Sequence, residues 1–315
     1  MSGYLQNGQW QRGWYDTRKT RGEFVRTTAA FRNWITADGS SGFKAQPGRY
    51  HLYVSLACPW AHRTVIFRVL KRLEDVVTLS VVDPVMHDDG WEFSEAPGCI
   101  PDTVNGFRYL REAYTAADPS YSGRVTVPVL WDRGRRTIVN NESSEIIRML
   151  NCAFDAFTPV RDDYYPQALR ARIDEINALV YERVNNGVYR CGFAGSQQAY
   201  DAAFDRLFSA LDELEARLAA SRYLVGDTLT EADWRLFTTL LRFDAVYYVH
   251  FKCNLRRIAD YPNLSRLLRD LYRVPGLAQT VNMDHIKRHY YMSHPHLNPS
   301  GIVPKGPVLE FMTAM

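Results

Sequence analysis

A lone cysteine followed by proline, at the junction of a short apolar strand and an amphipathic helix, is the feature that most constrains this chain. Residues 53–70 read YVSLACPWAHRTVIFRVL. The unpaired N–H groups and the dipole of a helix N-terminus stabilise negative charge. Pro59 suits the first helical position, because its missing N–H would have no partner there. Cys58 is therefore predicted to be a reactive thiol, since helix N-termini lower the pKa of cysteine side chains.

The residue three positions after this cysteine limits the chemistry that the thiol can perform. A dithiol oxidoreductase would carry a second cysteine there, whereas this chain has Ala61. A mixed disulfide on Cys58 then has no neighbouring thiol to resolve it and requires an external thiol. The alternative is that Cys58 is a small buried apolar residue, as free cysteines usually are. The surrounding pattern favours a two-step reaction with one protein thiol.

The residues on either side of the turn predict a β-α-β unit. A strand over 49–56 is followed by a helix over 60–73, and a β-branched strand follows over 76–84. The predicted solvent face of the helix carries four basic residues: Arg63, Arg68, Lys71 and Arg72. A β-α-β unit of this kind requires a right-handed crossover and a parallel pair of strands.

The remainder of the N-terminal half continues this arrangement. Residues 84–123 show no clear periodicity, and a stretch of this length is usually functional or an insertion. Two strands are predicted over 126–132 and 137–143, joined by a turn, and a helix over 142–151. The order β-α-β-insert-β-β-α is the thioredoxin arrangement.

Two further motifs supply candidate binding residues. In thioredoxin-like folds the residue before a cis proline faces the catalytic cysteine and offers its backbone to a peptide-like ligand. Val127 precedes Pro128, and a cis bond is expected there on the fold alone, because only about 5–6% of X-Pro bonds are cis. Glu142 and Ser143 begin a helix and can receive an ammonium group and a carboxylate. Simple helix capping is the alternative, and both roles can coexist.

Beyond residue 162 the pattern predicts only helices. Apolar stripes with helical spacing run over 169–184 and 204–218. Thr230 and Asp233 have the spacing of a capping box at a helix start. The fold class is thus α/β plus all-α. The expected parts are an aromatic and basic N-terminal arm (1–49), a thioredoxin-like domain (50–155) and an all-helical domain with a coil tail (162–315).

The bulk composition excludes several classes of protein. A chain of 315 residues can form two compact domains, and a net charge of +3 is too small to indicate a nucleic-acid partner. No apolar run reaches the ~18 residues of a membrane span. Five scattered cysteines favour free thiols in a reducing, cytoplasmic compartment. The basic arm leaves a transit peptide open, whereas its aromatic residues favour an arm that packs on the body.

Taken together, the motifs resemble the glutathione transferase superfamily, and within it the glutathionyl-hydroquinone reductases, the Xi class. The resemblance covers nearly the whole chain, from Gln9 to Pro307. It rests on CPWAHRT, DDGWEF, GRVTVPVLWD, NNESSEIIRML, NNGVYRCGFA, LTEADWRLF and HYYMSHPHLNPSGIVPKGP. CPW alone is shared with Omega-class relatives, whereas NNGVY combined with GIVPKGP is highly specific. The resemblance implies a glutathione-binding thioredoxin-like domain, an all-helical transferase domain and a homodimer.

The resemblance also implies the residue roles. Cys58 would be the nucleophile that forms a mixed disulfide with glutathione while an S-glutathionyl hydroquinone is reduced, and oxidised glutathione would be released. Tyr189 and Tyr290 would be catalytic phenols that face the aromatic substrate. The implied glutathione-binding residues are Trp91, Arg124, Val127, Glu142 and Ser143. Plain packing for Trp91 and a surface charge for Arg124 are the alternatives.

Several alternatives stay open at this point. The histidines at 285, 289, 294 and 296 invite a metal site, but no nearby residue other than Asp284 completes a ligand shell, and the resemblance implies no metal. An Omega-like thioltransferase or dehydroascorbate reductase would use the same nucleophile. A non-catalytic transferase-like assembly module would not require the cysteine. The expected partners are glutathione and glutathionylated quinones or hydroquinones, with neither nucleic acid nor membrane.

Overall fold

The structure is a computed structural model that describes residues 3–313. The chain divides into two compact units that interleave along the sequence. The first unit comprises Met1–Trp14, Thr27–Asp162 and Gln279–Val303, and the second comprises Tyr15–Arg26, Asp163–Ala278 and Pro304–Met315. The N-terminal arm thus contributes to both units, and part of the C-terminal region belongs to the first, whereas the domains expected from sequence are continuous ranges.

A four-stranded sheet forms the centre of the first unit. Its strands are β5 (Tyr50–Val54), β6 (Val77–Val81), β8 (Val129–Asp132) and β9 (Thr137–Asn140). They lie in the order β6-β5-β8-β9, with β6 and β5 parallel and the other pairs antiparallel. The parallel pair and the later antiparallel pair confirm the predicted thioredoxin-like arrangement.

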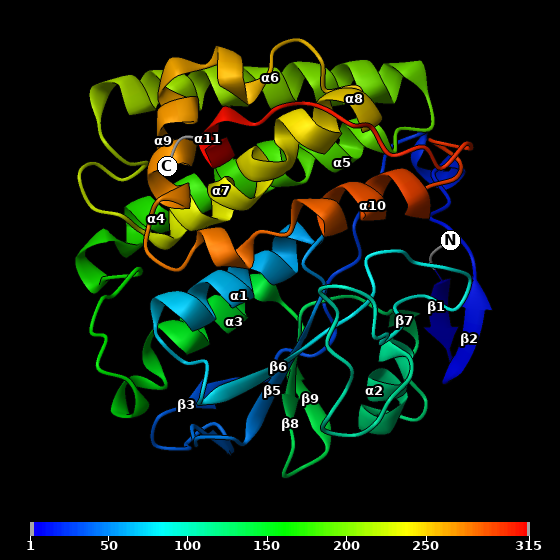
Figure 1. Cartoon of the computed structure of the whole chain (residues 1–315), viewed down its shortest axis with the longest axis vertical. Helices are drawn as coiled ribbons and strands as arrows, with labels where there is room; N and C mark the ends of the chain where they lie inside the picture. Colours follow the sequence, from blue (N-terminus) through cyan, green and yellow to red (C-terminus); the bar gives the residue numbers. More distant parts are fainter. Residues whose placement is uncertain (1–2, 314–315) are drawn as a thin grey trace. The chain divides into compact units, whose positions relative to one another are not determined.

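Helices cover this sheet and bury its central strand. The helices of the first unit are α1 (Pro59–Leu70), α2 (Leu110–Ala117), α3 (Ser143–Cys152) and α10 (Met283–Ser293). α1 and α3 pack side by side, and α2 contacts β9 (Figure 1). β5 is buried along its whole length because it lies between β6 and β8 and contacts α1.

α1 is more deeply buried than its amphipathic pattern predicted. Arg63 and Lys71 were expected to face solvent, and this expectation is wrong, because each is only 1% exposed. The Arg63 guanidinium lies 4.5 Å from the Trp60 ring and donates a 3.3 Å hydrogen bond to Ser143. The Lys71 ammonium donates to the Asp162 carbonyl at 2.8 Å. The apolar periodicity predicted the helix correctly. Segments that are distant in sequence cover its charged side, which the periodicity does not show.

The segment between β6 and β8 contains regular structure that the sequence pattern did not reveal. α2 begins where the Glu112 carboxylate accepts a 3.1 Å hydrogen bond from the Tyr109 N–H. β7 (Gly123–Arg124) then pairs with the arm in a three-stranded sheet. The remaining strands of the first unit are β1 (Gly3–Gln6), β2 (Gln9–Arg12), β3 (Ile35–Thr36) and β4 (Phe43–Lys44). The start of the arm is therefore a β-hairpin, β1–β2, that packs on β7.

The second unit is built from helices. Its α-helices are α4 (Arg170–Leu179), α5 (Gly187–Gly192), α6 (Gln197–Ala220), α7 (Glu231–Arg242), α8 (Tyr248–His250), α9 (Pro262–Tyr272) and α11 (Glu310–Thr313). π-Helical turns precede α5 at Val180–Asn185 and α8 at Phe243–Tyr247. α7 is buried along its whole length and packs against α4 and α9. Among the helices that the structure describes, none combines the length and apolarity of a membrane span.

The predicted capping box at the start of α7 is confirmed. The Asp233 carboxylate accepts hydrogen bonds from the Thr230 N–H at 3.0 Å and from the Leu224 N–H at 2.8 Å. The same carboxylate is fully buried, and desolvation raises the pKa of Asp233 from 3.8 to about 6 despite these bonds. The carboxylate thus organises the helix start while its charged form is disfavoured.

We expect Asp233 to make the stability of the fold depend on pH. Because the folded-state pKa lies above the unfolded value of 3.8, the folded state binds more protons between 3.8 and about 6. The contribution of Asp233 is therefore largest below 3.8 and is lost as the pH rises through about 6. Over this window the wild type should lose about 3 kcal/mol relative to Asp233→Asn, which cannot titrate. Urea unfolding of both proteins at several pH values measures this difference; parallel profiles would contradict the prediction.

Candidate active site

Cys58 occupies the N-cap position of α1, immediately after β5. Its backbone is extended, with φ −77° and ψ 123°, and Pro59 is the first helical residue. The half-buried thiol lies 3.7 Å from the Val127 carbonyl oxygen, to which it can donate. The Val127–Pro128 bond is cis, as predicted. The thiol thus faces both the start of a helix and the loop before β8.

Tyr114 of α2 hydrogen-bonds to two separate loops, the one before the cis proline and the one before α3. Its buried hydroxyl donates to the Thr126 carbonyl at 2.8 Å and accepts from the Thr126 N–H at 3.2 Å. The Asn141 side chain donates to the same hydroxyl at 3.1 Å. One phenol therefore ties the segment before the cis proline to the segment before α3. Sequence reasoning missed Tyr114 because it did not predict α2.

Glu142 and Ser143 lie at the start of α3, as predicted. One oxygen of the Glu142 carboxylate accepts from the Ser144 N–H at 3.0 Å and from its hydroxyl at 2.8 Å. Glu142 therefore performs the capping role that was the alternative to ligand binding. Its second oxygen forms no hydrogen bond within the described residues, so a ligand ammonium can still bind there. Ser143 is 3% exposed, and its hydroxyl accepts the bond from Arg63.

Trp91 lies in the insert after β6 and stacks on a histidine of α10. The Trp91 and His289 rings are 5.0 Å apart and inclined by 19°. Nδ1 of His289 lies 2.8 Å from the Pro84 carbonyl oxygen, which can only accept, so Nδ1 carries a proton. His285 bonds to the Pro97 carbonyl at 2.8 Å. The spacing of these histidines along one helix face was the available signal for this contact.

The other histidines of this region pack against aromatic rings. His294 lies 5.5 Å from Trp14 and 5.8 Å from Tyr290, and His296 lies 4.7 Å from Trp14. Within residues 3–313, no group of three or more His, Cys, Asp or Glu side chains is arranged to hold a metal ion. These contacts are ring packing, which is one of the two roles expected for these residues; the substrate-pocket role stays a prediction.

Arg124 lies on β7 and contacts the N-terminal hairpin. Its guanidinium donates to the Gly13 carbonyl at 2.7 Å and to the Gly3 carbonyl at 3.2 Å. It also lies 5.3 Å from the centre of the Tyr4 ring. The resemblance implies that this guanidinium binds a carboxylate of glutathione. In this structure the guanidinium joins the arm to β7.

The two candidate phenols belong to different units. Tyr290 lies on α10 in the first unit, with Cys58 and the predicted glutathione-binding residues, and is 1% exposed. Tyr189 lies on α5 in the second unit, with 9% of its surface exposed. The rings around Tyr189 include those of Phe24, Phe193, Tyr247 and Phe251.

Comparisons with known proteins agree with the two units. The family model described as the glutathione S-transferase N-terminal domain matches residues 57–152, and the one described as the glutathione S-transferase C-terminal domain matches 197–270. Glutathionyl-hydroquinone reductase YqjG of Escherichia coli (strain K12) is 56% identical over 97% of this chain and 95% of that protein. Glutathionyl-hydroquinone reductase PcpF of Sphingobium chlorophenolicum is 55% identical over 97% and 96%.

Solved structures extend the comparison to the fold. The glutathione-bound structure of YqjG matches with a TM-score of 0.91 and 52% identity, and the match covers 98% of this chain and 97% of that one. The Xi class glutathione transferase of Natrialba magadii matches with a TM-score of 0.92 and 50% identity, over 98% and 94%. These proteins are similar to this chain over nearly its whole length.

We expect Tyr114→Phe to destabilise the first unit and loosen the candidate site. The substitution keeps the ring but leaves the Thr126 N–H and the Asn141 amide without their acceptor, a loss of about 1–3 kcal/mol. Urea unfolding measures the stability, and calorimetric titration with glutathione should show weaker binding. Tyr4→Phe is the matched control, because the Tyr4 hydroxyl makes no hydrogen bond in the described part of the chain. Equal effects of the two variants would contradict the bridging role.

Proposed function

The chain belongs to the glutathionyl-hydroquinone reductases, the Xi class of the glutathione transferase superfamily, and we propose that it reduces S-glutathionyl hydroquinones with glutathione as co-substrate. The observation that carries the proposal is Cys58 at the N-terminus of α1, 3.7 Å from the Val127 carbonyl. The helix N-terminus favours the thiolate. Because Ala61 replaces a second cysteine, the thiolate must exchange with external glutathione.

The first step transfers a glutathionyl group to the protein. The Cys58 thiolate attacks the sulfur of the S-glutathionyl hydroquinone and forms the S–S bond of a Cys58–glutathione disulfide. The bond between that sulfur and the ring carbon breaks, and its electron pair stays on the ring. The ring carbon takes up a proton, so the free hydroquinone leaves as the reduced product.

The second step restores the thiolate. The thiolate of a second glutathione attacks the glutathionyl sulfur of the mixed disulfide, which releases oxidised glutathione and Cys58. In total, one S-glutathionyl hydroquinone and one glutathione become one hydroquinone and one oxidised glutathione. The ring carbon gains hydrogen and is reduced, while two thiol-level sulfurs become a disulfide. No metal or redox cofactor takes part in this balance.

The proposed glutathione site lies in the first unit, around Cys58. Val127 would pair its backbone with the cysteinyl amide of glutathione. Arg124 would bind a carboxylate, and Trp91 would cover the tripeptide. Glu142 would receive the γ-glutamyl ammonium on its unbonded carboxylate oxygen, with Ser143 donating to the adjacent carboxylate. The structure supports this arrangement by the contact of Cys58 with Val127 and by the Tyr114 hydrogen bonds that tie both loops together.

Tyr189 and Tyr290 would serve the aromatic half of the substrate. Negative charge develops on the ring as the carbon–sulfur bond breaks, and a phenol can hydrogen-bond the ring oxygens or donate the required proton. The resemblance of the chain further supports a homodimer, and the scattered free cysteines favour the cytoplasm. The homodimer, the cytoplasmic location and the catalytic role of Cys58 are all parts of this proposal.

We expect Cys58→Ser to abolish both hydroquinone release and the reduction of a small disulfide. Glutathione binding, followed by calorimetry, should persist, because a hydroxyl fits where the thiol was. Cys152→Ser is the control: Cys152 is an exposed cysteine, and its loss should leave both activities intact.

In the wild type, iodoacetamide should label Cys58 at pH values well below the ~8.5 of an ordinary thiol. Burial raises the pKa of Cys99 and Cys253, so neither should compete. Turnover by Cys58→Ser would refute the mechanism.

The double variant Tyr189→Phe/Tyr290→Phe tests the substrate assignment. It keeps both rings and removes the hydroxyls, so we expect hydroquinone release to fall by ~10²–10⁴-fold relative to small-disulfide reduction. The sulfur leaving group of a small disulfide needs no proton from a phenol beside an aromatic ring. A chromatographic assay of free hydroquinone and a coupled assay of oxidised glutathione give the ratio. A wild type that reduces disulfides without releasing hydroquinone would instead identify an Omega-like thioltransferase.

A further inference from the structure

The part of the N-terminal arm that belongs to the second unit is anchored beside α5. The Gly195 N–H donates to the Gly22 carbonyl at 2.8 Å, and the Ser196 hydroxyl donates to the Arg21 carbonyl at 3.0 Å. Phe24 is buried, and its ring lies 5.3 Å from Phe193. The segment is therefore held to the second unit by hydrogen bonds to its backbone and by the buried Phe24 ring.

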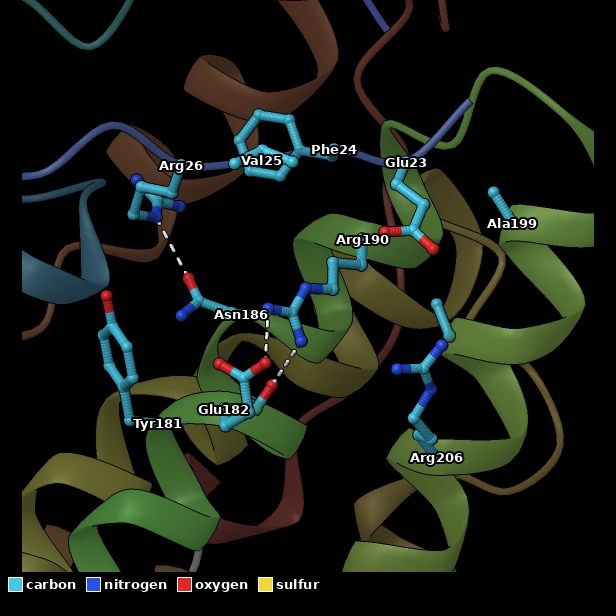
Figure 2. Close-up of a pocket in the computed structure, with 11 residues that line it drawn as sticks. Glu23, Phe24, Val25, Arg26, Tyr181, Glu182, Asn186, Arg190, Ala199 and Arg206 are labelled. Carbon is cyan, nitrogen blue, oxygen red and sulfur yellow. Dashed lines mark hydrogen bonds and ion pairs between the residues drawn. The ribbon is translucent and has the colours of Figure 1, made fainter. Parts of the chain in front are cut away.

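Arg26, two residues further along, lies over the ring of Tyr189. Its guanidinium carbon is 4.8 Å from the centre of the Tyr189 ring. Its Nε donates a 3.0 Å hydrogen bond to the side-chain oxygen of Asn186. Figure 2 shows this pair at one side of a cavity of about 290 Å³. Asn186 and Tyr189 both belong to the NNGVY motif, so one short motif supplies the anchor of the guanidinium and the ring below it.

We propose that Arg26 is a positioning residue for Tyr189: held by Asn186, its positive charge stabilises the negative charge that Tyr189 acquires when it donates a proton to the departing hydroquinone. The inference rests on the proposed function, because Tyr189 needs this assistance only if it acts as an acid. A cation over the face of an aromatic ring is attracted to it, and a phenolate ring increases that attraction. The same contact also holds the ring in one orientation.

The charged groups that line the cavity beside Arg26 include Glu23, Glu182, Arg190 and Arg206, and the Glu182 carboxylate is paired with Arg190 at 2.6 Å. The ring partners of Tyr189 include Phe24, Phe193, Tyr247 and Phe251. The Cys253 thiol lies 4.0 Å from the Val188 carbonyl, next to Tyr189 in the chain. Burial, together with the neighbouring Cys191, raises the pKa of Cys253, which keeps this thiol neutral. Arg26 is half-buried, and the aromatic rings around Tyr189 limit the solvent screening between its guanidinium and the Tyr189 ring.

The same cavity provides a matched control. Arg206 lines it from α6, and its Nε donates to the Ala202 carbonyl of its own helix at 3.0 Å. Figure 2 shows Arg206 on a different wall from Arg26. Arg206→Met thus removes a guanidinium from the cavity and leaves the contact with Tyr189 in place. Arg26→Met removes the charge at similar length, and Arg26→Lys keeps the charge without the planar group.

The experiment compares these variants with the wild type in the full-length protein. For each protein, kcat and KM for release of hydroquinone from an S-glutathionyl hydroquinone are measured across pH, beside small-disulfide reduction. We expect Arg26→Met to lower kcat for release by about threefold to thirtyfold with little change in KM. Without the cation the Tyr189 phenol is a weaker acid and stays protonated up to a higher pH. The alkaline decline of kcat should therefore move to higher pH in Arg26→Met. Arg26→Lys should keep kcat and the alkaline decline close to the wild-type values, because it keeps the charge. Arg206→Met should match the wild type.

The outcomes separate this inference from the proposed function. If the wild type and Tyr189→Phe release hydroquinone equally well, Tyr189 is no acid and the inference falls with that part of the proposed function. If Tyr189→Phe is impaired while Arg26→Met keeps the wild-type rate and alkaline limb, Arg26 alone is wrongly assigned. If Arg26→Met and Arg26→Lys lose release and disulfide reduction equally, with an unshifted limb, the role of Arg26 is structural and the inference is overturned.

Discussion

The junction between β5 and α1 is the constraint on which the rest of the proposed site depends. β5 is buried along its whole length, and α1 begins at Pro59, directly after Cys58. The thiol therefore lies at the N-terminus of a helix that is fixed by packing against α3. The unpaired N–H groups of that helix start supply the local positive potential. The cis proline loop contributes the Val127 carbonyl, which faces the thiol at 3.7 Å.

The loops around this junction are held by buried polar contacts from distant segments. Tyr114 satisfies backbone groups of the loop before β8 and the Asn141 side chain before α3. α10 performs a similar task for the insert that carries Trp91, through His285, His289 and Ser293. Loop backbone that is buried needs such partners, because it has no ladder of its own. The proposed glutathione site is accordingly built from segments of the first unit that lie far apart along the chain.

The second unit holds the other part of the proposed chemistry in an aromatic environment. Tyr189 lies among aromatic rings that include Phe193 and Tyr247, and Phe24 of the N-terminal arm lies beside it. The arm thus serves both units: its hairpin pairs with β7 in the first, and residues 15–26 belong to the second. This arrangement agrees with the expectation that the aromatic residues of the arm pack on the body. The buried α7, with its capping box, is the centre of the same unit.

The sequence by itself determined the elements that depend on local pattern. The position of Cys58 at a helix start, the thioredoxin-like order of strands and helices, and the Thr230–Asp233 capping box all follow from neighbouring residues, because caps and periodicity are local properties. The resemblance of the motifs then identified the candidate site residues. Tertiary structure alone decided that Arg63 and Lys71 are buried, that α2 supplies Tyr114, and that His289 and Arg26 lie against Trp91 and Tyr189. Each of these contacts joins residues more than twenty positions apart or depends on segments that cover a helix from outside. The spacing of residues along one element carries no information about what packs against that element.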